Sequence, residues 1–344
     1  MQVKKIAFVN TNGQGVSLDF KRIQDRLAQE EQYQFSYYVQ SGSKRNPWVQ
    51  KGMEIGRQAF CEQADAVIVN DHSLPGADGM PAQQKRILLA TPSEYWFAQS
   101  LDQAGQGSGK KKEFSTVTHL ACTSPFIQNL LNERYQLRPD AVWAETNSPF
   151  VGELKQEDER RRLRDQLKQD YPGIQNRKIL LVLTFKETNR DMTDEATMLS
   201  LDVHRLFEQW GDDWFLLTNS KNLIRNLDRS DLTDEDCQRI GLVQQKMLIR
   251  DMVKAADFLV TNHGTHACEA AAAGRPVLAL QYKNRAFEQY MQANYSELCL
   301  TSIQELIDAK TASPAREAGY RRFCAEHTYA DGQPAVDCIV RWLE

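Results

Sequence analysis

The sequence predicts an α/β protein with two parallel-sheet domains, and three observations support that prediction. Its 344 residues exceed the roughly 250–300 at which one hydrophobic core tends to split in two. Short, continuously apolar runs alternate with longer amphipathic stretches, as in parallel sheets that helices cover on both faces. A charge-dense segment at residues 151–177 interrupts this rhythm, which then starts again.

The composition is that of an ordinary globular protein, with 41% hydrophobic and 26% charged residues. A net charge of −4 offers no global field to attract a polyanion, which argues against nucleic acid as a partner. Seven scattered cysteines form no CxxC pair or disulfide framework, so reduced thiols in a cytoplasm are the simple interpretation. No signal peptide or transmembrane run is visible, so we expect a cytoplasmic protein, with peripheral contact at the inner face of a membrane still open.

In the first half of the chain, five short apolar runs predict strands. They lie at residues 5–9, 66–69, 87–90, 120–122 and 141–144. Each run ends in small or polar residues, which read in order NTNGQG, NDHS, TPSE, TSP and ETNS. Because parallel sheets bind ligands beyond the carboxyl ends of their strands, these polar segments are candidate ligand contacts.

Residues 151–177 predict a solvated helix or helical linker, ended by Pro172 and Gly173. A helix is expected around residues 195–210, and PAVDCIVRWLE predicts a helix at the end of the chain. Further strands are predicted at residues 179–183, 214–217, 240–243, 258–260 and 277–280. The predicted domains are 1–150, a linker at 151–177, a second domain at 178–325 and a helix at 326–344 that can pack back on the first domain.

Two glycine-rich segments resemble phosphate-binding motifs but lack residues that those motifs require at fixed positions. GQGSGKKK at residues 105–112 lacks the first glycine and the Ser/Thr of a Walker A loop, so a flexible basic loop is the better interpretation. NGQGVSLDF at residues 12–20 has Leu18 where a dinucleotide fingerprint needs its third glycine. Neither an ATP site nor a classical NAD-binding turn is therefore supported.

The segment TNHGTHACEAAAAGRP, residues 261–276, predicts a strand end, a polar turn and the start of a helix. Gly274 provides a helix stop and Pro276 a bend before the next strand. A helix N-terminus has unpaired N–H groups and favours phosphate by about 0.3–1 kcal/mol in exposed settings. This turn is therefore expected to bind a diphosphate, with Thr261, Asn262 and Thr265 as further donors.

In this segment a strand and a small polar turn are followed by the pattern Glu-Ala-x-x-x-Gly-x-Pro-Val, from Glu269 to Val277. That order resembles the carboxy-terminal domain of GT-B glycosyltransferases. KILLVLTFKE at residues 178–187 is similar to the strand and loop that begin that domain. In the related CDP-glycerol glycerophosphotransferases this loop often reads Pro-Thr-Phe/Trp-Arg, and Thr184, Phe185 and Lys186 keep that order. The chain departs from their Asp-Tyr-Ser-Ser turn, since Asn262-His263-Gly264-Thr265 stands there.

The resemblance implies a GT-B fold, with two Rossmann-like domains facing across a cleft. The nucleotide donor would bind mostly to the second domain and the acceptor, a glycan or lipid-linked molecule, mostly to the first. It also implies a metal-independent transferase without a cofactor, because the nucleotide-activated donor is itself a substrate. The oligomeric state is left open.

Nine residues are predicted to bind the donor nucleotide: Thr184, Lys186, Arg190, Asn219, Asn262, His263, Gly264, Thr265 and Glu269. Simpler interpretations stay open for several of them. Lys186 and Arg190 could be solvated loop cations, and Glu269 could be a solvated glutamate that complements the helix dipole. His263 and His266 are spaced to share a metal, but no third ligand is placed by spacing, so no metal site is predicted.

Transfer to a hydroxyl needs a general base with a pKa near the working pH. Asp71 and His72, at the end of AVIVN, are the best-placed pair, because histidine is intrinsically suited to this task. Asp19 and Glu94 are competing candidates. The neighbouring Tyr95-Trp96-Phe97 could stack on a sugar or belong to the core.

The main functional hypothesis is a glycosyltransferase that moves a sugar from a nucleotide-diphosphate donor to a hydroxyl, in cell-surface polysaccharide or glycoconjugate synthesis. One alternative keeps the site but transfers glycerol phosphate or a similar alditol phosphate from a CDP donor. A nucleotide-sugar 2-epimerase and a non-catalytic GT-B-like binding partner are the others.

Overall fold

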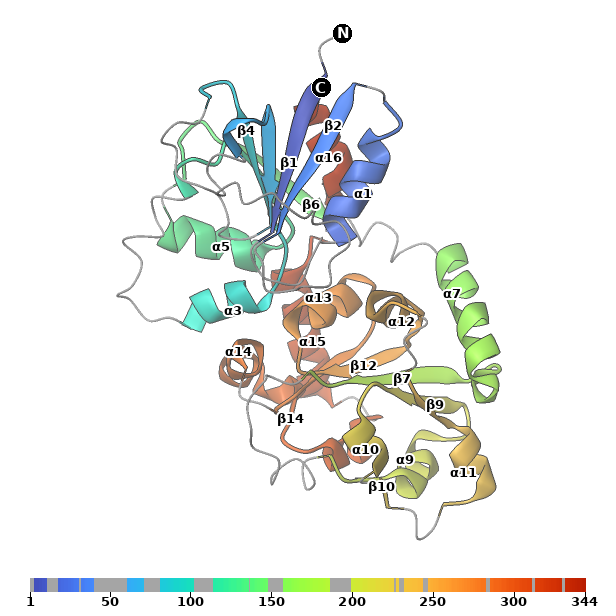
Figure 1. Ribbon diagram of the computed structural model, residues 1–344. Helices are drawn as coiled ribbons and strands as arrows, with labels where there is room; N and C mark the ends of the chain where they lie inside the picture. Colours follow the sequence, from blue (N-terminus) through green and yellow to red (C-terminus); the bar gives the residue numbers. More distant parts are fainter. Residues whose placement is uncertain are drawn as a thin grey trace. The chain divides into compact units, whose positions relative to one another are not determined.

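The computed structural model describes residues 3–10, 18–30, 32–39, 61–70, 81–101, 114–135, 137–147, 157–185, 199–225, 227–228, 232–243, 247–282, 285–310, 313–329 and 332–344. The chain forms two compact units (Figure 1). Unit 1 comprises Met1–Pro92, Asp102–Gly152 and His327–Glu344, and unit 2 comprises Ser93–Leu101 and Glu153–Glu326. The short segment 93–101 therefore belongs to the second unit although it lies within the first third of the sequence.

Unit 1 is built on a parallel sheet of seven strands among the described residues, in the order β15-β6-β5-β4-β3-β1-β2. The strands are β1 (Lys4–Asn10), β2 (Tyr33–Val39), β3 (Ala66–Val69), β4 (Lys85–Ala90), β5 (His119–Cys122), β6 (Val142–Asn147) and β15 (Gln333–Pro334). The five predicted strands are all present. The two edge strands, β2 and β15, were not predicted from the sequence.

Helices α1 (Leu18–Leu27) and α16 (Ala335–Leu343) pack on one face of this sheet, and α5 (Pro125–Arg134) completes the described helices of unit 1. Apolar residues of α1 and α16 share a core with Ile87 and Leu89 of β4. Lys4 donates to the backbone carbonyls of Leu343 and Glu344 at 2.6 and 2.8 Å, which satisfies carbonyl groups at the end of α16. The C-terminal helix is thus fixed to the first strand.

Unit 2 contains a parallel sheet of six strands, again counted over the described residues, in the order β11-β9-β7-β12-β13-β14. They are β7 (Lys178–Leu183), β9 (Trp214–Thr218), β11 (Ile240–Leu242), β12 (Phe258–Thr261), β13 (Val277–Leu280) and β14 (Cys299–Leu300), with a separate pair of β8 (Leu201–Asp202) and β10 (Leu227–Asp228). From β7 the chain moves outward to β9 and β11, and from β12 it moves the other way. The strand order therefore reverses between β7 and β12.

The helices of unit 2 lie around this sheet (Figure 1). They are α3 (Glu94–Leu101), α7 (Glu157–Asp170), η1 (Pro172–Ile174), α9 (Val203–Trp210), α10 (Lys221–Arg225), α11 (Asp234–Gln238), α12 (Ile249–Ala255), α13 (Gly264–Ala272), α14 (Ala286–Asn294), η2 (Ser296–Leu298), η3 (Ile303–Lys310) and α15 (Pro314–His327). No helix in the described ranges is long and apolar enough to cross a membrane.

Helix α7 occupies the charge-dense segment, and it packs rather than standing free. Leu163 and Leu167 are each 1% exposed, and Arg160 and Arg164 both bind the carboxylate of Asp257, at 2.5 and 2.6 Å. Because Asp257 directly precedes β12, these ion pairs connect the helix to the sheet. A helix is thus present in the segment where one was predicted, and its two leucines provide a narrow apolar stripe.

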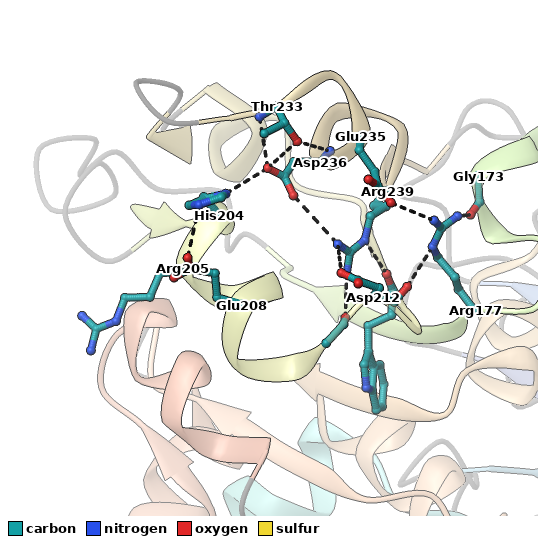
Figure 2. Close-up of polar contacts among 12 residues, drawn as sticks. Gly173, Arg177, His204, Arg205, Glu208, Asp212, Thr233, Glu235, Asp236 and Arg239 are labelled. Carbon is teal, nitrogen blue, oxygen red and sulfur yellow. Dashed lines mark hydrogen bonds and ion pairs between the residues drawn. The ribbon is translucent and has the colours of Figure 1, made fainter.

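A second polar network lies beside the first residues of β9 and β11 (Figure 2). The guanidinium of Arg239, a residue that is 2% exposed, contacts Asp212 at 3.2 Å and Asp236 at 3.9 Å. Asp236 also accepts hydrogen bonds from Thr233 in a capping box and contacts His204 at 3.0 Å. Asp212 precedes β9 and Arg239 precedes β11, so this network stabilises the amino-terminal edge of the sheet.

Candidate functional site

The candidate site of unit 2 lies where the strand order reverses. In open α/β sheets, ligands bind beyond the carboxyl ends of the strands at such a switch point. Thr184 and Phe185 follow β7, and Asn262 and His263 follow the neighbouring β12. The sequence-predicted donor residues of both segments therefore meet at one edge of the sheet.

Two asparagine side chains hold the backbone that leaves β7. Asn219, after β9, accepts the Thr184 N–H at 2.8 Å and donates to the Thr184 carbonyl at 3.0 Å. Asn262, after β12, does the same for Phe185, at 2.8 and 3.0 Å. These carboxamides satisfy backbone groups beyond the end of β7, so they fix the backbone of Thr184 and Phe185.

Asn262 is itself held by a buried carboxylate. It is 0% exposed, and its amide nitrogen also donates to Glu288 Oε1 at 3.1 Å. The other oxygen of Glu288, which is 1% exposed, accepts the Tyr282 N–H at 2.8 Å. Glu288 thereby connects the ends of β12 and β13. Asn262 and Asn219 are thus observed to bind backbone groups, and their contact with a donor stays a prediction.

Helix α13 begins at the predicted turn, with its first residue at Gly264. The N-cap is His263, whose side chain makes no capping hydrogen bond. The positive end of the helix dipole therefore lies at this turn, without a capping bond from the His263 side chain. Thr265 is the second residue of this helix and is half-buried.

A glycine is required at position 264 by close packing within unit 2. A Cβ on Gly264 would lie 2.2 and 2.6 Å from two atoms of the Phe97 ring and 3.0 Å from Phe287. Phe97 belongs to α3 and contacts the rings of Phe287 and Tyr290, each at 5.1 Å between centroids. Phe97 and Trp96 are 0% exposed, so the core interpretation of this aromatic segment is confirmed for both.

Three rings gather beside the start of α13. The His263 ring lies 4.8 Å from Phe185 and 4.7 Å from His266, measured between centroids. Burial, helped by the nearby His266, Arg285 and Arg250, lowers the pKa of His263 to about 3, against the opposing charge of Glu269. His263 is therefore neutral at pH 7, and its Nδ1 atom is buried with no hydrogen-bond partner among the described residues.

Glu269 lies deeper in the same helix and is 4% exposed. Arg250 of α12 donates to Glu269 Oε1, and His266 Nδ1 lies 3.0 Å from Oε2. Burial alone would raise the pKa of Glu269, but the Arg250 charge and the hydrogen bonds from His266 and Arg250 lower it to about 2. The interpretation of a solvated glutamate is wrong, because α13 packs this side chain against α12.

The site combines the start of helix α13 with two arginines. Arg285 donates to the Phe185 carbonyl at 3.5 Å, and both Arg285 and Arg250 lie close enough to depress the pKa of His263. Helix dipole, guanidinium groups and a neutral imidazole together form an environment that stabilises an anion. In the described ranges, no three His, Cys, Asp or Glu side chains gather into a group that could hold a metal.

Several predicted residues fall outside the described parts of the chain. Lys186, Arg190, Asp71 and His72 are among them, although Asp71 follows β3, which neighbours β1 at the strand reversal of the unit 1 sheet. Glu94 is the first residue of α3, and its side chain also lies outside the described parts of the chain. These residues keep the roles predicted from the sequence as predictions.

Asp19 is described and lies in the first turn of α1 in unit 1. Its side chain is 3% exposed. A first-turn carboxylate is favoured by the dipole of its own helix. Its predicted role as a base remains a prediction.

Arg250, Arg285 and Glu288 were not among the residues predicted from the sequence. Arg250 lies in the second position of α12, Arg285 is the N-cap of α14, and Glu288 lies in the first turn of α14. None belongs to a motif, and each is separated in sequence from the turn it supports. A search for charged residues at the starts of the flanking helices would have found all three.

Comparisons with known proteins agree with this fold. The sequence profile of the CDP-glycerol:poly(glycerophosphate) glycerophosphotransferase family matches residues 1–305. No curated protein matches the sequence. Among solved structures, a variant of the wall teichoic acid polymerase TagF is similar, with 15% identity, a TM-score of 0.64 and coverage of 99% of this chain and 88% of that chain.

Two further structures extend the comparison. A UGT transferase from Siraitia grosvenorii in complex with UDP has 11% identity and a TM-score of 0.61, covering 98% of each chain. The MnaA–UDP co-structure from S. aureus has 13% identity and a TM-score of 0.56, covering 99% of this chain and 96% of that chain. At such low identity the likeness shows the fold alone, and the predicted GT-B fold is confirmed.

Proposed function

Since the chain belongs to the CDP-glycerol:poly(glycerophosphate) glycerophosphotransferase family, we propose that it transfers an alditol phosphate from a CDP-activated donor to a polymer hydroxyl. The family match over residues 1–305 is the observation that carries this proposal. In the reaction, the acceptor oxygen forms a bond to the distal phosphorus of the donor. The bond from that phosphorus to the bridging oxygen breaks, and CMP leaves. Glycerol phosphate is the first candidate for the transferred group.

The start of α13 is the proposed binding site for the donor diphosphate. The helix dipole, Arg250 and Arg285 would stabilise the negative charge that grows on CMP as it leaves. Gly264 and Thr265 are the proposed first-turn contacts. Lys186 and Arg190, which follow the same strand as Phe185, are proposed to add charge from the loop.

His263 suits the role of a neutral hydrogen-bond donor rather than that of a base. Because the pKa of His263 is about 3, its imidazole is a weak base and would accept a proton poorly at pH 7. Its buried Nδ1 has no partner among the described residues, so a phosphoryl oxygen could accept a hydrogen bond there if that nitrogen carries the proton. The proton of the acceptor hydroxyl is proposed to go to His72 or Asp71, with Asp19 and Glu94 as the alternatives.

We further propose that the transfer needs neither a metal nor a cofactor. Two arginines and the helix dipole supply positive charge at the proposed diphosphate site, which is the role a divalent cation would otherwise fill. The reaction is proposed to take place in the cytoplasm, on a glycan or lipid-linked acceptor at the inner face of the membrane.

A sugar nucleotide is the second candidate donor. The UGT transferase with bound UDP has the same fold over 98% of this chain, and the position of α13 after β12 suits any nucleoside diphosphate. A glycosyltransferase would release the nucleoside diphosphate, whereas the proposed transferase releases the monophosphate. The released nucleotide therefore separates the two functions.

A nucleotide panel tests the donor site. Thermal unfolding would be measured with CDP-glycerol, CDP, CMP, UDP and GDP, each with and without EDTA. A ligand at 100 times its dissociation constant stabilises the folded state by about 2.7 kcal/mol. We expect the largest shift with CDP-glycerol and no effect of EDTA. Stabilisation by UDP alone, or loss of the CDP-glycerol shift in EDTA that zinc or magnesium restores, would contradict the proposal.

A further inference from the structure

Unit 1 contains a buried arginine that nothing in the described structure pairs. Arg86 is the second residue of β4, and its side chain is 6% exposed. Its Nε and Nη1 atoms are buried and have no hydrogen-bond partner among the described residues. A buried guanidinium without a counter-charge is rare, because removing a charge from water costs free energy that a partner normally offsets.

The position of Arg86 is fixed by its backbone. Its N–H donates to Thr118 Oγ1 at 2.7 Å, and its carbonyl accepts the Thr118 N–H at 2.9 Å. Ile87, the next residue, belongs to the core that α1 and α16 share, so strand alternation places Arg86 on the opposite face of the sheet. The guanidinium is thus held at the amino-terminal end of β4 by the strand that carries it.

A second cation, Arg138, acts electrostatically on Arg86. Burial, together with the positive charge of Arg138, lowers the pKa of Arg86, yet an arginine remains charged at neutral pH. Arg138 is paired with Asp140 at 2.6 Å, and its side chain is 37% exposed. Arg86 therefore carries an uncompensated charge and lies within the field of a like charge.

We propose that Arg86 is the centre of an anion-binding site whose ligand is a phosphate group. The planar guanidinium fork matches phosphate and carboxylate geometry, and the neighbouring Arg138 favours a ligand with more than one negative charge. Inorganic phosphate and a phosphate monoester such as glycerol 3-phosphate share that chemistry. The site lies at the amino-terminal edge of the unit 1 sheet, and the proposal does not rest on the donor site proposed at α13 of unit 2.

Calorimetric titration of the full chain with inorganic phosphate tests this site, with sodium chloride at equal ionic strength as the reference. Arg86→Met should weaken the phosphate affinity at least tenfold. Without phosphate, its melting temperature should equal or exceed that of the parent, because the substitution removes an unpaired buried charge. His263→Phe should leave the Arg86-dependent binding intact, which separates this site from α13. Tighter binding of glycerol 3-phosphate than of phosphate would indicate an ester as the ligand.

Arg138→Gln provides a second variant, because this side chain is 37% exposed and its ion pair with the exposed Asp140 lies at the surface. It should weaken phosphate binding at least threefold by removing the neighbouring charge. The proposal is overturned if Arg86→Met binds phosphate as the parent does, or if it melts well below the parent, which would indicate a structural partner for Arg86. If Arg86→Met does not fold, unchanged affinity in Arg138→Gln overturns the proposal in the same way.

Discussion

Asn262 holds Phe185 through both of its backbone polar groups, accepting the N–H at 2.8 Å and donating to the carbonyl at 3.0 Å. Asn219 holds Thr184 in the same way from the other side of β7. Side chains from the two neighbouring strands thus continue the pairing of β7 by two residues. The consequence is a fixed backbone at Phe185, whose ring contacts the His263 ring.

Replacing Asn262 by alanine should lower the free energy of unfolding by about 2–4 kcal/mol, because Phe185 and Glu288 would lose partners in a buried environment. Asn219→Ala is the matched control. It removes the same pair of bonds at a half-buried position and should cost about half as much. Urea denaturation measures both. Equal losses would show that the Glu288 connection does not contribute.

His263→Phe should reduce affinity for a nucleoside diphosphate about tenfold, since a hydrogen bond to a charged group contributes about 1.5–3 kcal/mol. The ring packing with Phe185 is retained, so the melting temperature of the unliganded protein should not fall. His266→Phe is the control: it removes the bond to Glu269 and should lower stability with little effect on nucleotide binding. Undiminished nucleotide affinity in His263→Phe would remove this residue from the site.

Glu269→Gln should lower the free energy of unfolding by about 3–5 kcal/mol at neutral pH, because it breaks a buried ion pair. The pKa of Glu269 falls from 4.5 to about 2 on folding, so the contribution of its charge is fully present above pH 4.5. It is lost as the pH falls from about 4.5 to about 2. Denaturation curves of both proteins across that range should converge, and a difference that does not depend on pH would contradict the ion pair.

Gly264→Ala should destabilise the protein by about 1–3 kcal/mol, because the added Cβ would lie 2.2 Å from an atom of the Phe97 ring. The same substitution in a Phe97→Leu background should cost much less, since the smaller side chain leaves room. Thermal unfolding of the four proteins gives the coupling between the two positions. Additive effects would mean that another contact requires the glycine.

The parallel strands could be predicted because a strand that is buried on both faces consists of a continuous run of apolar residues. The bounds predicted for residues 66–69 and 277–280 match β3 and β13. β2 has the sequence YQFSYYV, in which polar residues alternate with aromatic ones, so no apolar run marked it. The two-residue strands, such as β14, are too short to leave any pattern.

The candidate site was predictable only in part. The turn at Asn262 to Thr265 was found because glycine, small polar residues and a following alanine helix lie together in the sequence. The cations beside it were not found, because Arg250 and Arg285 reach the turn from two other helices and only the fold brings them there. Glu269 was recognised as a candidate, but its burial depends on Arg250 of α12, which no local pattern indicates.

The central claim is the identity of the transferred group, and the most direct test is the nucleotide released from CDP-glycerol in the presence of a glycerol phosphate oligomer. Release would be followed by separating CMP from CDP, and the acceptor by its mass. We expect CMP, in amounts equal to the glycerol phosphate units added to the acceptor. Release of CDP, or no reaction with CDP-glycerol alongside UDP release from a sugar nucleotide, would contradict the account.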